Sequence, residues 1–227
     1  MRFQDAARDA RAVVYAGIQA DPLVAHAADL LADASLEQRV LARAVMNGES
    51  TDPGAWRATF PSLFGPDASG SAADRERSER ILDASLAVAG RGEQVRSQVR
   101  GALVEALTAR LLARRVGAAV VHRERRILFD GVPAEIHPYD VTVERPGAAE
   151  AFDCKWGARG INADVLHQLD DARSHAVDEE ERLAVALVVF DAARSCAVRL
   201  EGQTAPHELT GVVTLETLDQ LGRDPAR

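Results

Sequence analysis

Two acids and one lysine have residue types and a spacing that could do chemistry. Lys155 is the only lysine among 227 residues, and the other 26 basic side chains are arginine. Lysine is a compact point charge whose pKa shifts on burial, whereas arginine is planar and stays protonated. A chain that uses arginine wherever a plain positive charge suffices has lysine at this one position, which indicates a chemical requirement there.

The lysine and both acids fall on segments with strand patterns. Asp153 and Lys155 are two residues apart within 149–156, and because side chains alternate along a strand they share one face. Asp140 begins a shorter pattern at 140–144, which ends at a proline-glycine turn. If the two strands pair, two carboxylates and one ammonium group converge at one end of a sheet. Carboxylates with backbone or water oxygens suit a hard cation, of which Mg²⁺ is the common one.

This arrangement resembles a known family. Asp140, twelve intervening residues and then Asp153-Cys154-Lys155 are similar to the motif of the PD-(D/E)XK nuclease superfamily, the fold of many restriction enzymes and Holliday-junction resolvases. The resemblance covers about residues 91–190. The acid-x-lysine motif occurs often by chance, so the resemblance rests on the joint order of acids, lysine and strand patterns.

The helices expected before and after the strands also resemble helices of this superfamily. The helix before them contains Glu105 and is similar to the first helix of Mrr-type restriction and resolvase nucleases, whose glutamate joins the metal site. Gln168 follows the lysine strand, as in the nuclease domains of recombination helicases, where a helical glutamine supports the active site. Those relatives usually have a tyrosine four residues later, and this chain has Ala172.

The resemblance implies metal-dependent hydrolysis of phosphodiester bonds by in-line attack. Mg²⁺, with Mn²⁺ expected to substitute, would be held by Asp140, Asp153, the carbonyl of Cys154 and, directly or through water, Glu105. Lys155 would orient and help deprotonate the attacking water and stabilise charge on the phosphate. The catalytic set implied is therefore Lys155, Asp153, Asp140, Glu105 and Gln168.

The charge of the chain is unevenly distributed. The net charge is −8, which argues against general attraction to nucleic acid. Residues 91–126, however, contain nine arginines against three acids, and residues 162–182 contain seven acids against two arginines. An arginine-rich helix can present its arginines to solvent or bind phosphates with them, and the sequence favours neither interpretation. The candidate DNA contacts are Arg100, Arg114, Arg115, Arg123, Arg125 and Arg126.

The hydrophobic pattern predicts two domains, a helical one at residues 1–90 and an α/β nuclease-like one at 91–227. For the second we expect a restriction-endonuclease-like mixed sheet flanked by helices. The helices expected are 3–19, 23–46 with a break at Ser35, 72–89, 93–116, 162–182 and 215–221. Residues 49–70 read as a loop. The strands expected are 118–129, 140–144, 149–156, 183–190 and 211–214.

Composition narrows the class of protein. The longest apolar run, 183–190, is far too short to cross a membrane. Two cysteines, Cys154 and Cys196, are too few for a disulfide framework and fit a reducing compartment. No secretory signal pattern opens the sequence. We therefore expect a soluble cytoplasmic protein without a membrane partner.

The leading hypothesis is a bacterial DNA endonuclease in restriction, antiviral defence or DNA repair. Its helical domain would recognise a protein partner or the substrate, and a homodimer is expected by analogy because two strands need two sites. Two alternatives stay open, namely an RNA-directed nuclease and a catalytically silent subunit that keeps the fold for binding or assembly.

Overall fold

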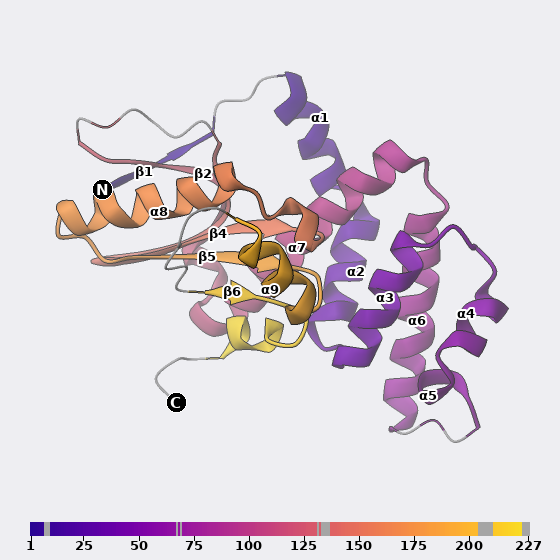
Figure 1. Ribbon diagram of the computed structural model, residues 1–227. Helices are drawn as coiled ribbons and strands as arrows, with labels where there is room; N and C mark the ends of the chain where they lie inside the picture. The colour runs from indigo at the N-terminus through magenta and orange to yellow at the C-terminus, as the bar shows by residue number, and fades with distance from the viewer. Residues whose placement is uncertain are drawn as a thin grey trace. The chain divides into compact units, whose positions relative to one another are not determined.

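The computed structural model describes residues 1–6, 10–66, 68, 70–130, 132, 137–203 and 211–223. The chain forms two compact units, one of Val13–Leu107 and one of Met1–Ala12 with Thr108–Arg227 (Figure 1). The division falls inside a long helix, α7, whereas the sequence places the domain boundary at the glycines of residues 90–92. The amino-terminal strand also belongs to the unit that contains the sheet.

The unit Val13–Leu107 is helical throughout its described elements. Capping boxes open two of its helices. The Oγ atoms of Ser35 and Ser71 each accept from the backbone N of the third helical residue, and the backbone N of each serine donates to the side chain of that residue. The expected break at Ser35 and the expected helix at 72–89 are therefore confirmed. Its helices are α1 (Ala10–Gln19, which begins in the other unit), α2 (Pro22–Ala32), α3 (Leu36–Asn47), α4 (Pro53–Thr59), α5 (Pro61–Phe64), α6 (Ala72–Ala89) and most of α7 (Glu93–Val116).

Two expectations for the first seventy residues are wrong. Residues 49–70 contain two short helices, because Asp52 caps the first of them and prolines occupy the first helical position of both. The helix expected from Phe3 is preceded by a strand, β1 (Arg2–Asp5). This strand pairs with residues more than a hundred positions away, and such tertiary pairing overrides a local helical pattern.

Asp21 stabilises the helical unit in two ways. Its carboxylate accepts a hydrogen bond from the backbone N of Leu23 at 2.9 Å, which caps α2, and it forms an ion pair with Arg91. The hydrogen bond from Arg91 is the largest cause of a lowered pKa of Asp21, ahead of the opposing effect of burial and the help of the capping bond. We expect Asp21→Ala to reduce the free energy of unfolding by about 1–2 kcal/mol.

The pH dependence of unfolding checks the Asp21 prediction. Because the folded-state pKa lies below the ordinary 3.8, the stabilisation is complete above that value and is lost as the pH falls through the folded pKa. Urea unfolding at neutral pH and below about pH 4 measures the effect, with Asp83→Ala, an exposed acid on α6, as the control. A variant as stable as the wild type at neutral pH would contradict the assignment.

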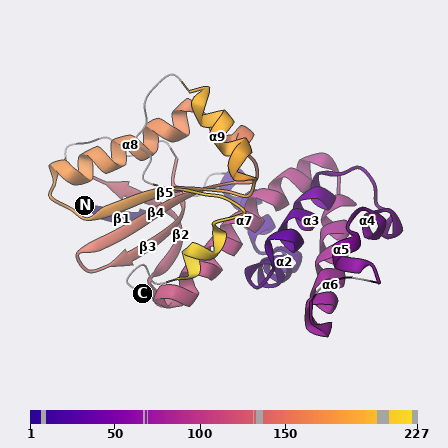
Figure 2. The ribbon, with the colours of Figure 1, turned by 60° about the horizontal axis from the view of Figure 1, so that its bottom comes forward.

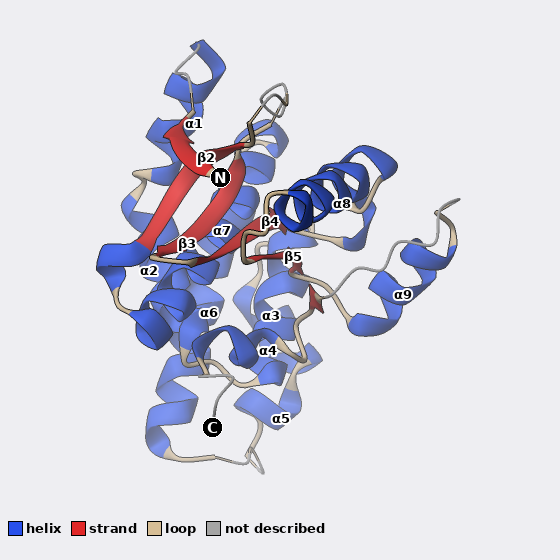
Figure 3. Cartoon of the chain, turned by 90° about the vertical axis from the view of Figure 1, so that its left-hand side faces the viewer, coloured by secondary structure: helices blue, strands red, loops and turns tan. Residues whose placement is uncertain are grey.

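The other unit contains a mixed sheet whose described strands are six, in the order β1-β2-β3-β4-β5-β6. Figure 3 shows the strands side by side in red. The first four run antiparallel to their neighbours, and β5 and β6 are added in parallel. The α/β class with a mixed sheet flanked by helices is thus confirmed. The strands after β1 are β2 (Val121–Leu128), β3 (Tyr139–Arg145), β4 (Ala148–Lys155), β5 (Leu183–Val189) and β6 (Val212–Val213).

The turn between β3 and β4 fixes their register. Arg145 and Ala148 are partners, so Pro146 and Gly147 form a two-residue turn. Proline presets the first turn position and Gly147 takes the second, with φ of 73°, a left-handed value that favours glycine. The expected turn is confirmed, and it determines which residues of β3 face those of β4.

Helices cover both faces of the sheet. Figure 2 shows α8 (Ala163–Asp178) and α9 (Ala193–Glu201) over one face, where Ala151 and Leu187 pack with Leu166 and Leu169 of α8. The opposite face meets the second half of α7, where the thiol of Cys154 donates a hydrogen bond to Thr108 Oγ1 at 3.5 Å. β4 therefore has one face toward α8 and the other toward α7. Short 3₁₀ turns, η1 (Ala118–Val120), η2 (Ala158–Gly160) and η3 (Leu218–Gly222), complete the unit.

Three elements in the last third differ from expectation. α8 ends at Asp178 instead of 182, since the chain takes a left-handed conformation at Glu180 before entering β5. α9 was not expected. The helix expected at 215–221 is the short 3₁₀ turn η3. Among the described helices, none is both long and apolar enough to cross a membrane.

Candidate functional site

Strand pairing brings the two expected acids together. In the antiparallel register of β3 and β4, Val141 is the partner of Phe152 and Thr142 of Ala151. Asp140 precedes Val141 on β3 and Asp153 follows Phe152 on β4, so the same register continued by one step would set the two acids opposite each other. Directly opposed residues of antiparallel strands point to the same face. The pairing that the sequence analysis required for its metal site is therefore present.

Asp140 is fixed by the strand it faces. Its Oδ2 atom accepts a hydrogen bond from the backbone N of Cys154, with 2.6 Å between the two atoms. A hydrogen bond to an ionised carboxylate is short and about twice as strong as one between neutral groups. It ties Asp140 to the peptide between Asp153 and Lys155, so the three charged side chains share one rigid piece of sheet.

Lys155 sits among these carboxylates. Its Nζ atom donates to Oδ1 of Asp153, and the two side chains are 26% and 12% exposed, respectively. Burial favours the neutral amine and lowers the pKa of Lys155, but the nearby charges of Asp153 and Asp140 outweigh it and raise that pKa above its ordinary value. Lys155 is therefore an ammonium ion at neutral pH.

The backbone around Lys155 holds the lysine stem in place. The carbonyl of Lys155 accepts a hydrogen bond from Phe190 N at 2.9 Å, which links the ends of β4 and β5. A Cβ atom added at Gly160 would lie 2.9 Å from Cβ, Cγ and Cδ of Lys155. Residue 160 is therefore a place of close approach where glycine leaves room for the lysine.

We expect Gly160→Ala to slow any reaction that depends on Lys155. The added methyl group must displace the lysine stem or the strand, and a misplacement of about 1 Å can cost up to roughly 100-fold in rate. The measurement is the Mg²⁺-dependent cleavage rate, with Mn²⁺ affinity and thermal unfolding in parallel. Gly202→Ala is the matched control, because its nearest atoms lie at an ordinary 3.6 Å. A wild-type rate in Gly160→Ala would refute this positioning role.

A further carboxylate, which the sequence analysis did not single out, lies beside Asp140. Arg123 pairs with Val141 and Arg125 with Tyr139, so Glu124 lies opposite Asp140 on β2. Carboxylate oxygens of the two residues lie within 4.8 Å of one another. Glu124 also has φ of 53°, an uncommon conformation for a residue other than glycine. No local pattern identifies it, because only the register of β2 on β3 reveals the neighbour.

The two residues inferred only from the resemblance have defined partners. Gln168 donates from Nε2 to the carbonyl of His137 at 3.0 Å and so holds the chain three residues before Asp140. Glu105 lies on α7 in the helical unit, is buried, and accepts hydrogen bonds from Tyr15 and from Gln19, the latter at 2.7 Å. Its role as a metal ligand stays a prediction.

The arginines proposed for nucleic-acid binding divide into two groups. Three are held in ion pairs, namely Arg100 with Glu93, Arg115 with Glu150, and Arg125 with Glu144 and Asp5. Arg114 and Arg123 are exposed and Arg126 is partly buried on β2. Arginines that already neutralise acids add little to the attraction of a phosphate backbone, so exposed Arg123 is the better candidate.

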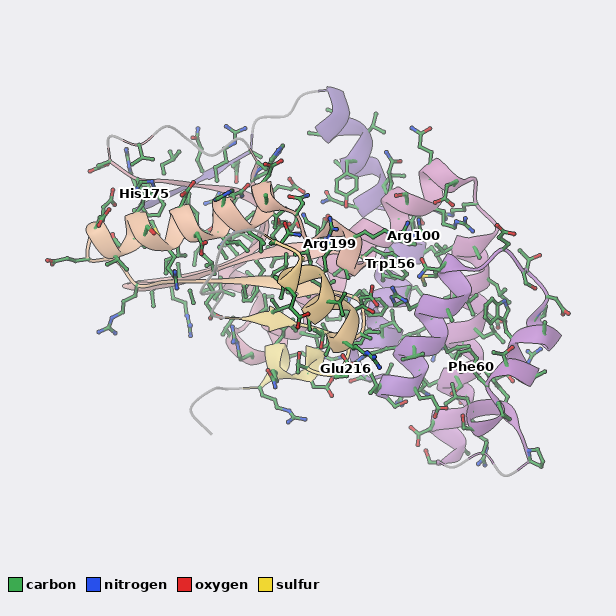
Figure 4. All side chains as sticks on the ribbon, in the orientation of Figure 1. Phe60, Arg100, Trp156, His175, Arg199 and Glu216 are labelled. Atoms are coloured by element: carbon green, nitrogen blue, oxygen red, sulfur yellow. The ribbon has the colours of Figure 1, made fainter. Side chains whose placement is uncertain are left out.

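An aromatic pair borders the site. Trp156, labelled in Figure 4, follows Lys155 at the end of β4 and stacks on Phe190, with ring centroids 5.0 Å apart and planes 25° apart. Phe190 is buried and Trp156 partly exposed. The pair links the residues that follow β4 and β5.

The donor set suits a hard divalent cation. Asp140 and Glu124 offer carboxylate oxygens within 4.8 Å of one another on neighbouring strands, whereas the Asp153 carboxylate is bound to Lys155. Backbone carbonyls such as that of Cys154 are of the same ligand type. Lys155 supplies a positive charge that offsets the charge of Asp153.

Comparisons of the chain with family models, with curated proteins and with solved structures give no match.

Proposed function

We propose that the chain is a Mg²⁺-dependent nuclease, an endonuclease that hydrolyses phosphodiester bonds of DNA. The observation that carries the proposal is the antiparallel pairing of β3 and β4, in which Asp140 accepts from the backbone N of Cys154 and the chain's only lysine is bound to the neighbouring Asp153. Two carboxylates and one ammonium group within one partly buried site bind both a cation and an anionic phosphate.

The order of elements supports a restriction-endonuclease-like fold. A helix, α7, precedes three antiparallel strands, β2 to β4, and a second helix, α8, leads to the parallel strand β5. The lysine and its acid partner end the third of these strands. Fold alone does not define an activity, so the proposal rests on the site.

Each side chain has a distinct part in the proposed reaction. Asp140, Asp153 and Glu124 would hold the ion, and Glu105, which lies one helical turn before Thr108 on α7, is proposed as a further ligand. The bound ion supplies Lewis-acid polarisation of the phosphate and a more acidic water. Because its pKa is raised, Lys155 acts as a cation that orients the attacking water and stabilises charge on the phosphate.

The remaining expectations belong to the same proposal. Exposed Arg114 and Arg123 would contact phosphates, which makes binding sensitive to salt. The helical unit would recognise a protein partner or the substrate, and a homodimer would supply a site for each DNA strand. A cytoplasmic nuclease in bacterial restriction, antiviral defence or DNA repair fits these parts.

A second candidate function is that of a silent subunit with the same fold. The observation that favours it is the ion pair of Lys155 with Asp153, which also fits a purely structural pair. Cleavage of supercoiled plasmid, linear plasmid and RNA by the wild type separates the candidates. We expect nicked and then linear plasmid with Mg²⁺ or Mn²⁺ and no product with EDTA. Cleavage of RNA alone would make the substrate RNA, and no cleavage of any substrate would leave the silent subunit.

A further inference from the structure

A pocket of about 480 Å³ lies in the α/β unit where β4 and β5 begin. Its apolar lining comes from small and aliphatic side chains, and its polar lining comes from arginines and one glutamate. Its volume falls within the range of about 300–1,000 Å³ that is usual for small-molecule sites. The lining residues are Arg115, Val116, Arg145, Ala148, Ala149, Glu150, Arg182, Leu183 and Ala184.

The charge of this pocket is opposite to that of the chain as a whole. Three guanidinium groups, those of Arg115, Arg145 and Arg182, face a single carboxylate, Glu150, in a protein of net charge −8. Glu150 accepts from Arg115 at 2.6 Å and from Arg145 at 2.9 Å. Arg182 is exposed and has no ion pair among the described residues. One carboxylate therefore balances only one of three positive charges.

Arg115 adds a mostly buried positive charge to the wall of the pocket. Its side chain is only 10% exposed, and its Nε atom is buried without a hydrogen-bond partner among the described residues. A buried polar group without a partner destabilises the fold, and more so when it is charged. Three guanidinium groups that line one pocket are complementary to an oxyanion, which accepts several hydrogen bonds from arginines at once.

We propose that this pocket binds a phosphate group carried by an organic molecule of nucleotide size. The phosphate would accept from Arg145 and Arg182 and lie near the positive charge of Arg115, and the rest of the molecule would lie on Val116, Ala148 and Leu183. The planar guanidinium group of arginine matches the geometry of a phosphate. The apolar lining residues would contact the organic part of the ligand, which an inorganic phosphate ion lacks. Two sources share this chemistry, namely a free nucleotide and the phosphorylated end of a nucleic-acid strand.

The pocket is separate from the proposed hydrolytic site. Glu150 and Lys155 are five residues apart on the same strand, which corresponds to about 16 Å along β4. Side chains of Glu150 and Asp153 also alternate to opposite faces of the sheet. A phosphate in the pocket is therefore not the phosphate that is hydrolysed, and binding there is measurable without cleavage.

Calorimetric titration of the full chain tests the proposal. The probes are adenosine 5′-monophosphate, adenosine, and a short oligothymidine with and without a 5′-phosphate, run on the wild type and on Asp153→Asn to exclude turnover. We expect the phosphorylated probe to show a saturable binding phase that its unphosphorylated counterpart lacks. Binding of the monophosphate assigns the ligand to free nucleotides, and binding of the phosphorylated oligonucleotide alone assigns it to strand ends.

The test variants are made at the two exposed arginines of the pocket. Arg115 is not replaced, because Arg115→Ala would remove the closest hydrogen-bond partner of Glu150. Arg182→Ala and Arg145→Ala are each expected to weaken binding at least tenfold, while Arg194→Ala on α9, also exposed, leaves it unchanged. Binding that is unaffected by both pocket variants would overturn the proposal. So would the absence of saturable binding of every phosphorylated probe at millimolar concentration, whether or not the chain cleaves DNA.

Discussion

Replacing Asp153 by asparagine is expected to lower the rate of Mg²⁺-dependent cleavage by about 10³-fold, a loss of roughly 4 kcal/mol of transition-state stabilisation. Asparagine keeps the size of the side chain but removes the negative charge that would hold the ion. The Asp153 side chain is 12% exposed and is ion-paired with Lys155, so the loss of its charge also removes the partner of the lysine. We expect Mn²⁺ affinity to fall together with the rate.

The controls for Asp153→Asn separate chemistry from folding. Asp178 is an exposed acid at the end of α8, far from Asp153 in the sequence. Asp178→Asn removes the same charge, and this variant should cleave at the wild-type rate. Thermal unfolding of both variants shows whether the sheet is intact. A folded Asp153→Asn protein that binds Mn²⁺ and cleaves at the wild-type rate would exclude Asp153 as a ligand.

Lys155→Ala is expected to lower the cleavage rate by about 10²–10³-fold while it preserves, or tightens, Mn²⁺ binding. The ammonium group stabilises charge on the phosphate, and its loss also removes the cation that competes with a metal ion for Asp153. This pattern of a slower rate without weaker metal binding distinguishes Lys155 from the acids.

Lys155→Arg sharpens the same prediction. It keeps the positive charge, but the guanidinium group is planar and larger, and the lysine stem already packs closely against Gly160. We expect little or no recovery of the rate. Full activity in Lys155→Arg would mean that any positive charge suffices, against the argument from a chain with a single lysine.

Local patterns predicted those parts of the fold that local interactions determine. α6 and α7 begin and end where capping residues and hydrophobic spacing place them. β5 follows from its unbroken apolar run, which is typical of a strand covered on both faces. The pairing of β3 with β4 was predictable as well, because the proline-glycine turn fixes their register.

Long-range pairing determines what the sequence alone did not predict. β1 is a strand only because β2 is available as its partner, and Arg2–Asp5 has no strand pattern of its own. Glu124 joins the acids through the register of β2 on β3, across a connection that no turn pattern defines. Gly160 matters because the chain folds back onto the stem of Lys155, a contact that depends on the end of β4.

The most direct test of the central claim is Mg²⁺-dependent nicking of supercoiled plasmid by the wild type and by Asp140→Asn/Asp153→Asn in one assay. The claim predicts product from the wild type with Mg²⁺ and none with EDTA. It also predicts no product above background from the folded double variant. Equal cleavage by both proteins would contradict the claim that the paired ends of β3 and β4 form a metal-dependent phosphodiesterase site.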